Sequence, residues 1–277
     1  GWALNHAQAN KPAKVLMFFG EDPPDILHNR LYALLQSPWV QASSRRAALI
    51  KENLEVRSMV GRPTALTERN RAREWMRSDI AKEISEYMLE HTPRLVCIDP
   101  LRQFHTMDEN DSGDMTQLIQ NLQTMAHDAQ STLIFNHHTN KNATTSGQGD
   151  IQQAARGSSA LTDNVRWQAN MMTMSEEEAL ACGMESFERK QYVRMALSKA
   201  NYTSSLHDIW FKREEGGILF PTDDVLIPPP PLSGGKRTSK TKNKTASTPS
   251  KSSESSYQDI SLVATPAKSS ASTTFPS

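Results

Sequence analysis

The chain has 277 residues, and its 31 lysines and arginines are balanced by 31 aspartates and glutamates. A chain of this length can bury the core of one large domain or of two small ones. No segment approaches the roughly 18 consecutive apolar residues of a membrane-spanning helix, and no secretory signal is visible at the N-terminus. Cys97 and Cys182 lack the spacing of a metal site or a redox pair. These features predict a cytoplasmic protein that does not associate with membranes.

Residues 228–277 differ in composition from the rest of the chain. Ser and Thr account for 20 of these 50 residues and Pro for 7, and seven basic residues outnumber two acidic ones. Too few apolar side chains are present to offset the entropy cost of ordering this segment. We therefore predict a disordered tail of net charge +5 over residues 228–277 and a folded unit of net charge −5 over residues 1–227.

Short apolar runs alternate with helical patterns in the first half of the folded unit. Continuous apolar runs at 15–19, 95–98 and 132–135 predict strands that are buried on both faces. Between them we expect a helix after Pro23-Pro24, a weaker strand at 54–60, a helix within 66–91 and a helix over 115–129.

The second half of the folded unit has a different pattern. A polar loop is expected at 139–153, followed by strands at 164–174, 191–200, 208–212 and 218–220, with a turn at Gly216-Gly217. These strands are expected to be antiparallel. The chain as a whole therefore predicts an α/β fold, in which helices flank both faces of a parallel sheet and antiparallel strands extend it.

Polar side chains follow each of the three apolar runs. Glu21 follows the first run, Asp99 the second, and His137 and His138 the third. Because ligands of an open parallel sheet bind beyond the carboxyl ends of its strands, we expect these side chains to converge on one site.

Each of these residues allows a functional and a structural interpretation. An apolar strand that ends in aspartate is typical of a Walker B motif that holds Mg²⁺, but Asp99 could equally cap the turn before Pro100. Glu21 could orient a water that attacks a γ-phosphate, or favour the dipole of the following helix. A histidine at the third strand end could donate a hydrogen bond to the γ-phosphate. An arginine such as Arg166 suits phosphate binding but could also form a surface ion pair.

Several motifs together resemble the plasmid RepA-type replicative helicases, which are hexameric RecA-like motor proteins related to DnaB-type helicases. The resemblance covers residues 15–219, and the motifs that carry it are Glu21-Asp22-Pro23-Pro24, Asp99-x-Leu101-Arg102-x-Phe104-His105, His137-His138, Arg156-Gly157-Ser158-Ser159, Asp163-Asn164-Val165-Arg166-Trp167-Gln168 and Ser198-Lys199-Ala200-Asn201-Tyr202. It implies a RecA-like P-loop ATPase core that uses ATP and Mg²⁺, a homohexameric ring and single-stranded DNA as a partner.

The resemblance also implies roles for individual residues. Glu21 is similar to the catalytic glutamate, Asp99 to the Walker B aspartate on Mg²⁺, and His138, with His137 beside it, to the γ-phosphate sensor. Arg166 is similar to an arginine finger that acts on the neighbouring subunit's nucleotide.

The same resemblance implies roles for three further basic residues. Lys199 is similar in position to a second cation that acts on the neighbouring subunit. Lys141 and Arg156 belong to the segment in which such rings contact single-stranded DNA, so they are candidate phosphate contacts.

One motif of the family is missing. No G-x-x-x-x-G-K-[ST] sequence is present, and Gly234-Gly235-Lys236-Arg237 does not fit it. We therefore expect an N-terminally truncated helicase that is inactive in this form. The alternatives are a degenerate RecA-like protein that binds DNA or a replication partner without hydrolysing ATP, and a metal-dependent hydrolase built on Asp99, His137 and His138.

Overall fold

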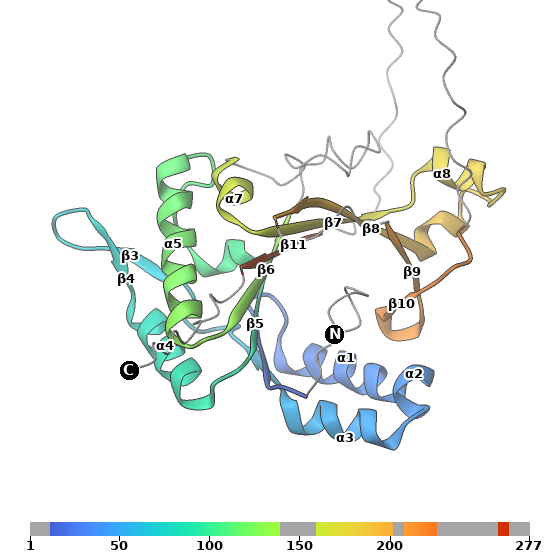
Figure 1. Ribbon diagram of the computed structural model, residues 1–277, viewed down its shortest axis with the longest axis horizontal. Helices are drawn as coiled ribbons and strands as arrows, with labels where there is room; N and C mark the ends of the chain where they lie inside the picture. Colours follow the sequence, from blue (N-terminus) through green and yellow to red (C-terminus); the bar gives the residue numbers. More distant parts are fainter. Residues whose placement is uncertain (1–11, 139–158, 202–207, 226–259, 266–277) are drawn as a thin grey trace, which may run out of the picture.

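A computed structural model describes residues 12–138, 159–201, 208–225 and 260–265 of the protein (Figure 1). The strands are β1 (Val15–Phe19), β2 (Leu54–Ser58), β3 (Thr67–Arg69), β4 (Trp75–Arg77), β5 (Leu95–Asp99), β6 (Thr132–His138), β7 (Trp167–Thr173), β8 (Tyr192–Ala200), β9 (Ile209–Arg213), β10 (Leu219–Pro221) and β11 (Ile260–Thr265). The α-helices are α1 (Pro24–Gln36), α2 (Pro38–Gln41), α3 (Ser44–Asn53), α4 (Asp79–His91), α5 (Ser112–Asp128), α7 (Ser159–Asn164) and α8 (Glu176–Ala181). Short 3₁₀ helices include η1 (Leu101–Phe104) and η4 (Glu215–Gly217).

The main sheet has nine strands in the order β10-β9-β8-β7-β11-β6-β5-β1-β2. Its β2-β1-β5-β6 part is parallel, with β1 between β2 and β5. Strands β7 to β10 pair antiparallel. This architecture confirms the predicted α/β class with a parallel sheet, flanking helices and antiparallel extension.

The hydrophobic core lies on one face of the parallel strands. Alternate residues of β1, β5 and β6, such as Phe18, Ile98 and Phe135, are at most 3% exposed. They pack against the buried faces of α4 and α5, while α1, α2 and α3 lie on the other side of the sheet (Figure 1). None of the helices in the described part of the chain is long and apolar enough to cross a membrane.

Two segments of the chain fold differently from the sequence-based prediction. The helix expected within 66–91 begins only at Asp79, where the Ser78 hydroxyl accepts a hydrogen bond from the Ala81 amide, and the preceding residues form the β3–β4 hairpin. Strand β11 lies within the tail that we predicted to be disordered, so that prediction does not hold for these six residues. Their sequence, ISLVAT, is rich in strand-forming side chains.

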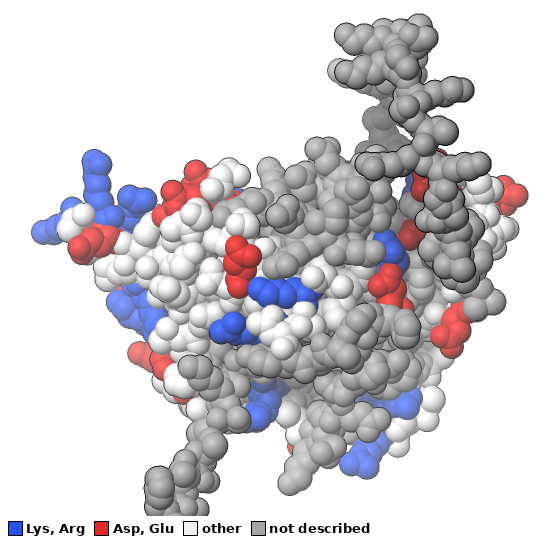
Figure 2. Space-filling model, turned by 45° about the horizontal axis from the view of Figure 1, so that its top comes forward, with Lys and Arg blue, Asp and Glu red and all other residues white. Residues whose placement is uncertain are grey.

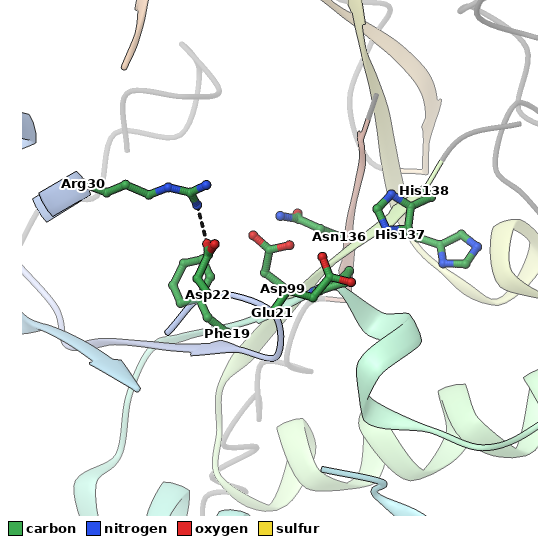
Figure 3. A pocket seen from close by; sticks show the side chains of 9 residues that line it. Phe19, Glu21, Asp22, Arg30, Asp99, Asn136, His137 and His138 are labelled. Carbon is green, nitrogen blue, oxygen red and sulfur yellow. Dashed lines mark hydrogen bonds and ion pairs between the residues drawn. The ribbon is translucent and has the colours of Figure 1, made fainter. Parts of the chain in front are cut away.

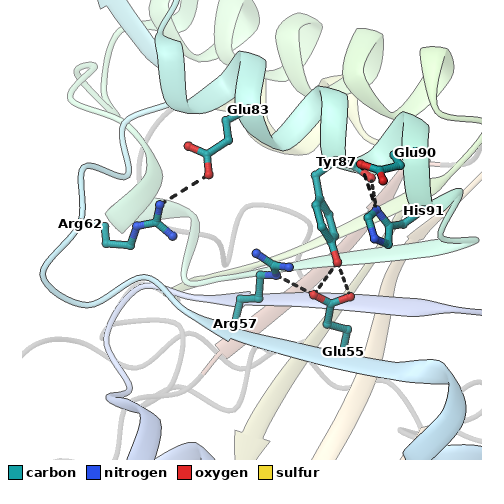
Figure 4. A network of polar contacts seen from close by, with 7 residues as sticks. All are labelled: Glu55, Arg57, Arg62, Glu83, Tyr87, Glu90 and His91. Atoms are coloured by element: carbon teal, nitrogen blue, oxygen red, sulfur yellow. Dashed lines mark hydrogen bonds and ion pairs between the residues drawn. The ribbon is translucent and has the colours of Figure 1, made fainter.

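The edge strand β2 is attached to α4 by a polar network (Figure 4). The Tyr87 hydroxyl donates to Glu55, 2.6 Å from Oε2, and Arg57 Nε donates to Glu55 Oε1 at 2.6 Å. The Arg57 guanidinium also lies 4.1 Å from the centre of the Tyr87 ring. Partial burial alone would raise the pKa of Glu55, but these hydrogen bonds hold it below its usual value.

Candidate functional site

A pocket of about 180 Å³ opens at the carboxyl ends of β1, β5 and β6 (Figure 3). It is lined by Phe19, Glu21, Asp22, Arg30, Asp99, Pro100, Asn136, His137 and His138. The structure thus brings together four of the residues that the sequence singled out, namely Glu21, Asp99, His137 and His138. The parallel register explains this, because Phe19 of β1 is paired with Asp99 of β5 in one row across the sheet.

Asp99 occupies the centre of the pocket and faces away from the hydrophobic core. Ile98, the preceding residue of β5, is paired with Phe135 of β6, and both are buried in the core. Asp99 and Asn136 therefore share the opposite face, where Asn136 donates a hydrogen bond to the carboxylate. Burial raises the pKa of Asp99 above its usual value, and the negative charges of Asp22 and Glu21 act in the same direction. A cation bound at this position would stabilise the charged form of the carboxylate.

Glu21 is held beside the pocket by η1. The Gln103 side chain donates a hydrogen bond of 3.0 Å to Glu21 Oε1. The adjacent Gly20 makes this approach possible, because a Cβ atom at residue 20 would lie 2.5 Å from the Gln103 Cβ atom. The Gly20 amide in turn donates to the Asp99 carbonyl oxygen at 2.8 Å. The strand ends that carry Glu21 and Asp99 are therefore in direct contact.

A cation that the sequence analysis missed also lines the pocket. Arg30 of α1 forms an ion pair with Asp22, with 2.5 Å between Nη1 and Oδ2. Asp22 precedes α1, which begins at Pro24, so the pair depends on how the chain enters the helix, and the i,i+4 spacing of paired charges on a helix could not have identified it. Asn136 was also missed as a partner of Asp99, although it lies two residues before His138 and hence on the same strand face.

The two histidines at the end of β6 point to opposite faces of the sheet. His137 is 2% exposed and lies on the core face with Phe135, whereas the partly buried His138 lies on the same face as Asn136. His105, which follows η1, is also buried and lies close enough to His137 to interact electrostatically. The alternation makes His138 the histidine that is available to a ligand beside Asp99.

The remaining predicted site residues lie elsewhere. Arg166 is exposed at the start of β7 and does not line the pocket. Lys199 of β8 caps the end of α7, where its ammonium group donates to the carbonyl oxygens of Thr162 at 2.8 Å and Asp163 at 2.9 Å. Lys141 and Arg156 lie outside the described residues.

The donor set of the pocket suits Mg²⁺ that is bound together with phosphate groups. In the described part of the chain, no group of three or more His, Cys, Asp or Glu side chains could hold a metal ion. Mg²⁺ is commonly bound through one or two carboxylates together with substrate phosphates, and Asp99 provides one such carboxylate. A metal site made only of Asp99, His137 and His138 does not fit, because His137 lies on the opposite face of β6.

The family comparison agrees with this geometry. The model of the AAA domain family matches residues 1–144, which include β1, β5 and β6 and every residue that lines the pocket. The parallel sheet with flanking helices and an antiparallel extension is consistent with a RecA-like core. Because the match covers more than half of the 277 residues, the chain belongs to the AAA domain family of P-loop ATPases.

Proposed function

We propose that the protein is the motor of a hexameric, ATP-dependent DNA helicase of the plasmid RepA type, which couples ATP hydrolysis to movement along single-stranded DNA. The observation that carries the proposal is the convergence of Glu21, Asp99 and His138 on one pocket of a P-loop ATPase fold. The proposal places the protein in the cytoplasm and assigns the ATPase activity to residues 1–227, with residues 228–277 as a tail.

The positions of the side chains in the pocket support a proposed role for each of them. Mg²⁺, when bound with ATP, would offset the charge that develops on the transferred phosphate. Asp99 would hold that ion, because its partly buried carboxylate is next to the charges of Asp22 and Glu21 and gains from a cation. Glu21 would accept a hydrogen bond from the attacking water, and the Gln103 amide fixes its orientation. His138 would donate to the γ-phosphate from the same face of the sheet.

The remaining proposed roles depend on assembly. Arg166 is exposed and does not line the pocket of its own subunit, which suits contact with the nucleotide of a neighbouring subunit. Lys199 of β8 is paired in the sheet with Gln168 of β7, two residues after Arg166. It would support Arg166 as a second cation. Lys141 and Arg156 would contact the phosphates of single-stranded DNA.

Two variants test the ATPase roles in a chain that includes a P-loop, which these 277 residues lack. Glu21→Gln should still bind a non-hydrolysable ATP analogue but lose hydrolysis by at least about a hundredfold. Arg166→Ala should retain nucleotide binding and lose DNA-stimulated hydrolysis. The controls are Asp25→Asn on α1 and Arg45→Ala on α3, which alter exposed charges that do not line the pocket. Normal stimulated turnover in Arg166→Ala would remove it from the proposed role.

A second candidate function is favoured by the missing P-loop motif. A degenerate relative that binds DNA or a replication partner without hydrolysing ATP needs the fold but not the phosphate-binding loop. If a longer natural chain also contains no P-loop and binds no ATP analogue, while still binding single-stranded DNA, this second function replaces the first.

A further inference from the structure

A basic hairpin projects from the body of the protein (Figure 1), and none of its residues lines the pocket. It consists of β3, β4 and the turn between them, residues 67–77, and we call it the basic hairpin. Its arginines are Arg69, Arg71, Arg73 and Arg77, against two glutamates. Figure 2 shows lysine and arginine side chains gathered at the end of this projection. The hairpin therefore carries a local positive charge, although the net charge of residues 1–227 is negative.

The arginines of the basic hairpin are available to a ligand. Arg69, Arg71 and Arg73 are exposed. Within the described residues, none of these three side chains forms an ion pair within 4 Å, whereas Arg62, just before the hairpin, pairs with Glu83 at 3.5 Å. The Arg69 guanidinium instead stacks over the Trp75 ring at 4.4 Å, which holds it in place without neutralising it.

Hydrogen bonds hold the turn of the hairpin beneath these charges. The Asn70 amide donates to the Glu74 carbonyl oxygen at 2.9 Å and closes the turn, and the Asn70 side chain bonds back to Glu74 at 2.9 Å and 3.0 Å. Next to the turn, where Trp75 is paired with Arg69, Trp75 Nε1 donates to Asp114 of α5 at 2.7 Å. A ligand that binds the tip therefore does not have to order a loose loop.

The chemistry of the tip favours phosphate groups over a protein surface. The turn residues are Asn70, Arg71, Ala72, Arg73 and Glu74, so the tip offers no large apolar side chain. Stable protein interfaces generally bury an apolar core, while phosphate contacts require only positive charge and hydrogen-bond donors. Guanidinium groups match phosphate oxygens with paired N–H donors. A two-stranded ribbon is also narrow enough to enter a nucleic-acid groove.

We propose that the basic hairpin is a binding site for the phosphate backbone of a nucleic acid, independent of base sequence, with Arg71 and Arg73 as its main contacts. The proposed site does not include the candidate DNA contacts Lys141 and Arg156, and it does not depend on ATP hydrolysis. Each phosphate contact releases counterions from the nucleic acid. The slope of the logarithm of affinity against the logarithm of salt concentration therefore reports the number of contacts.

The test compares two variants of equal charge in the full chain, without nucleotide. Arg71→Gln with Arg73→Gln removes the proposed contacts, and Arg45→Gln with Lys51→Gln removes two exposed charges from α3 as a control. Binding to a fluorescent 20-nucleotide strand and to its 20-base-pair duplex is followed by anisotropy from 50 to 200 mM salt. Equal melting temperatures of the proteins show that both variants are folded.

At 0.1 M salt the hairpin variant is expected to bind duplex about 60-fold, or a single strand about 25-fold, more weakly than the wild type. Its salt slope should fall by about 1.8 on duplex or about 1.4 on a single strand. If the loss of affinity is seen with only one of the two DNA forms, that form is the ligand of the hairpin. The control should change affinity less than about twofold. Equal affinities of wild type and hairpin variant, equal losses in both variants, or no binding by the wild type would each overturn the proposal. None of these results bears on the ATPase roles, which are measured separately with nucleotide.

Discussion

Lowering the pH should destabilise the protein through His105. Its side chain is fully buried, and His105 Nε2 lies 3.8 Å from Glu109 Oε1. Burial lowers the pKa of His105 from 6.5 to about 4; the charge of Glu109 opposes this shift, whereas Arg102 and His137 add to it. The folded protein therefore keeps this ring neutral at pH values where the unfolded chain already binds a proton.

The sign and size of the effect follow from these two pKa values. Because the folded state binds fewer protons, the contribution to stability is complete above pH 6.5 and is lost as the pH falls from 6.5 towards 4. The full shift corresponds to about 3 kcal/mol at about 1.4 kcal/mol per pH unit. Between pH 7.5 and pH 5.0, about 2 kcal/mol should be lost.

Urea unfolding of the wild type and of His105→Gln at both pH values isolates this contribution. The variant lacks the titrating ring, so its free energy of unfolding should fall by about 2 kcal/mol less than that of the wild type on acidification. His127→Gln is the control, because His127 is exposed on α5 and should leave the wild-type pH dependence almost unchanged.

The comparison concerns the change with pH and not the stability at pH 7.5, where His105→Gln can also disturb packing. If the wild type and His105→Gln lost the same free energy between pH 7.5 and 5.0, the reasoning from burial to a low pKa would be refuted. A larger loss in the variant would show that His105 gains a proton in the folded state and is stabilised by Glu109.

Four further substitutions probe the fold. Leu122→Ala should cost roughly 2 to 5 kcal/mol in urea unfolding, the usual range for a buried leucine, because Leu122 is 0% exposed in α5. Gly216 and Gly217 share a φ of 76°, so Gly217→Ala should cost about 1 kcal/mol, whereas Gly216→Ala should lower the melting temperature further because its Cβ would lie 2.6 Å from α1. Tyr87→Phe should cost about 1 kcal/mol and raise the pKa of Glu55, which NMR titration can measure, since the hydroxyl donates to that carboxylate.

The parallel strands could be predicted from the sequence because buried strands are continuously apolar. The runs at 15–19, 95–98 and 132–135 correspond to β1, β5 and β6 within a few residues. The basic hairpin could not be predicted in this way, because strands as short as β3 and β4 provide too few residues for a period of two. Its Trp75 and Met76 also fit the helical pattern that continues into α4.

The composition of the candidate site could be predicted, but not its internal geometry. The rule that strand ends meet at one edge was enough to group Glu21, Asp99 and His138. The contribution of Gln103 depends on how closely η1 approaches Gly20, a tertiary contact that leaves no periodic signal in the sequence. Sequence spacing therefore identified residues at strand ends and missed the neighbour that orients one of them.

The element η1 connects the pocket to the base of the basic hairpin. The side chain of Gln103 bonds to Glu21, while its carbonyl oxygen accepts a hydrogen bond from the Thr64 hydroxyl. The next carbonyl oxygen, that of Phe104, accepts from the Leu66 amide at 2.8 Å. Because Leu66 immediately precedes β3, a movement of the hairpin base relative to β1 must stretch or break one of these bonds. The proposed nucleic-acid contact and the proposed catalytic glutamate are thus attached to opposite sides of a single turn of 3₁₀ helix.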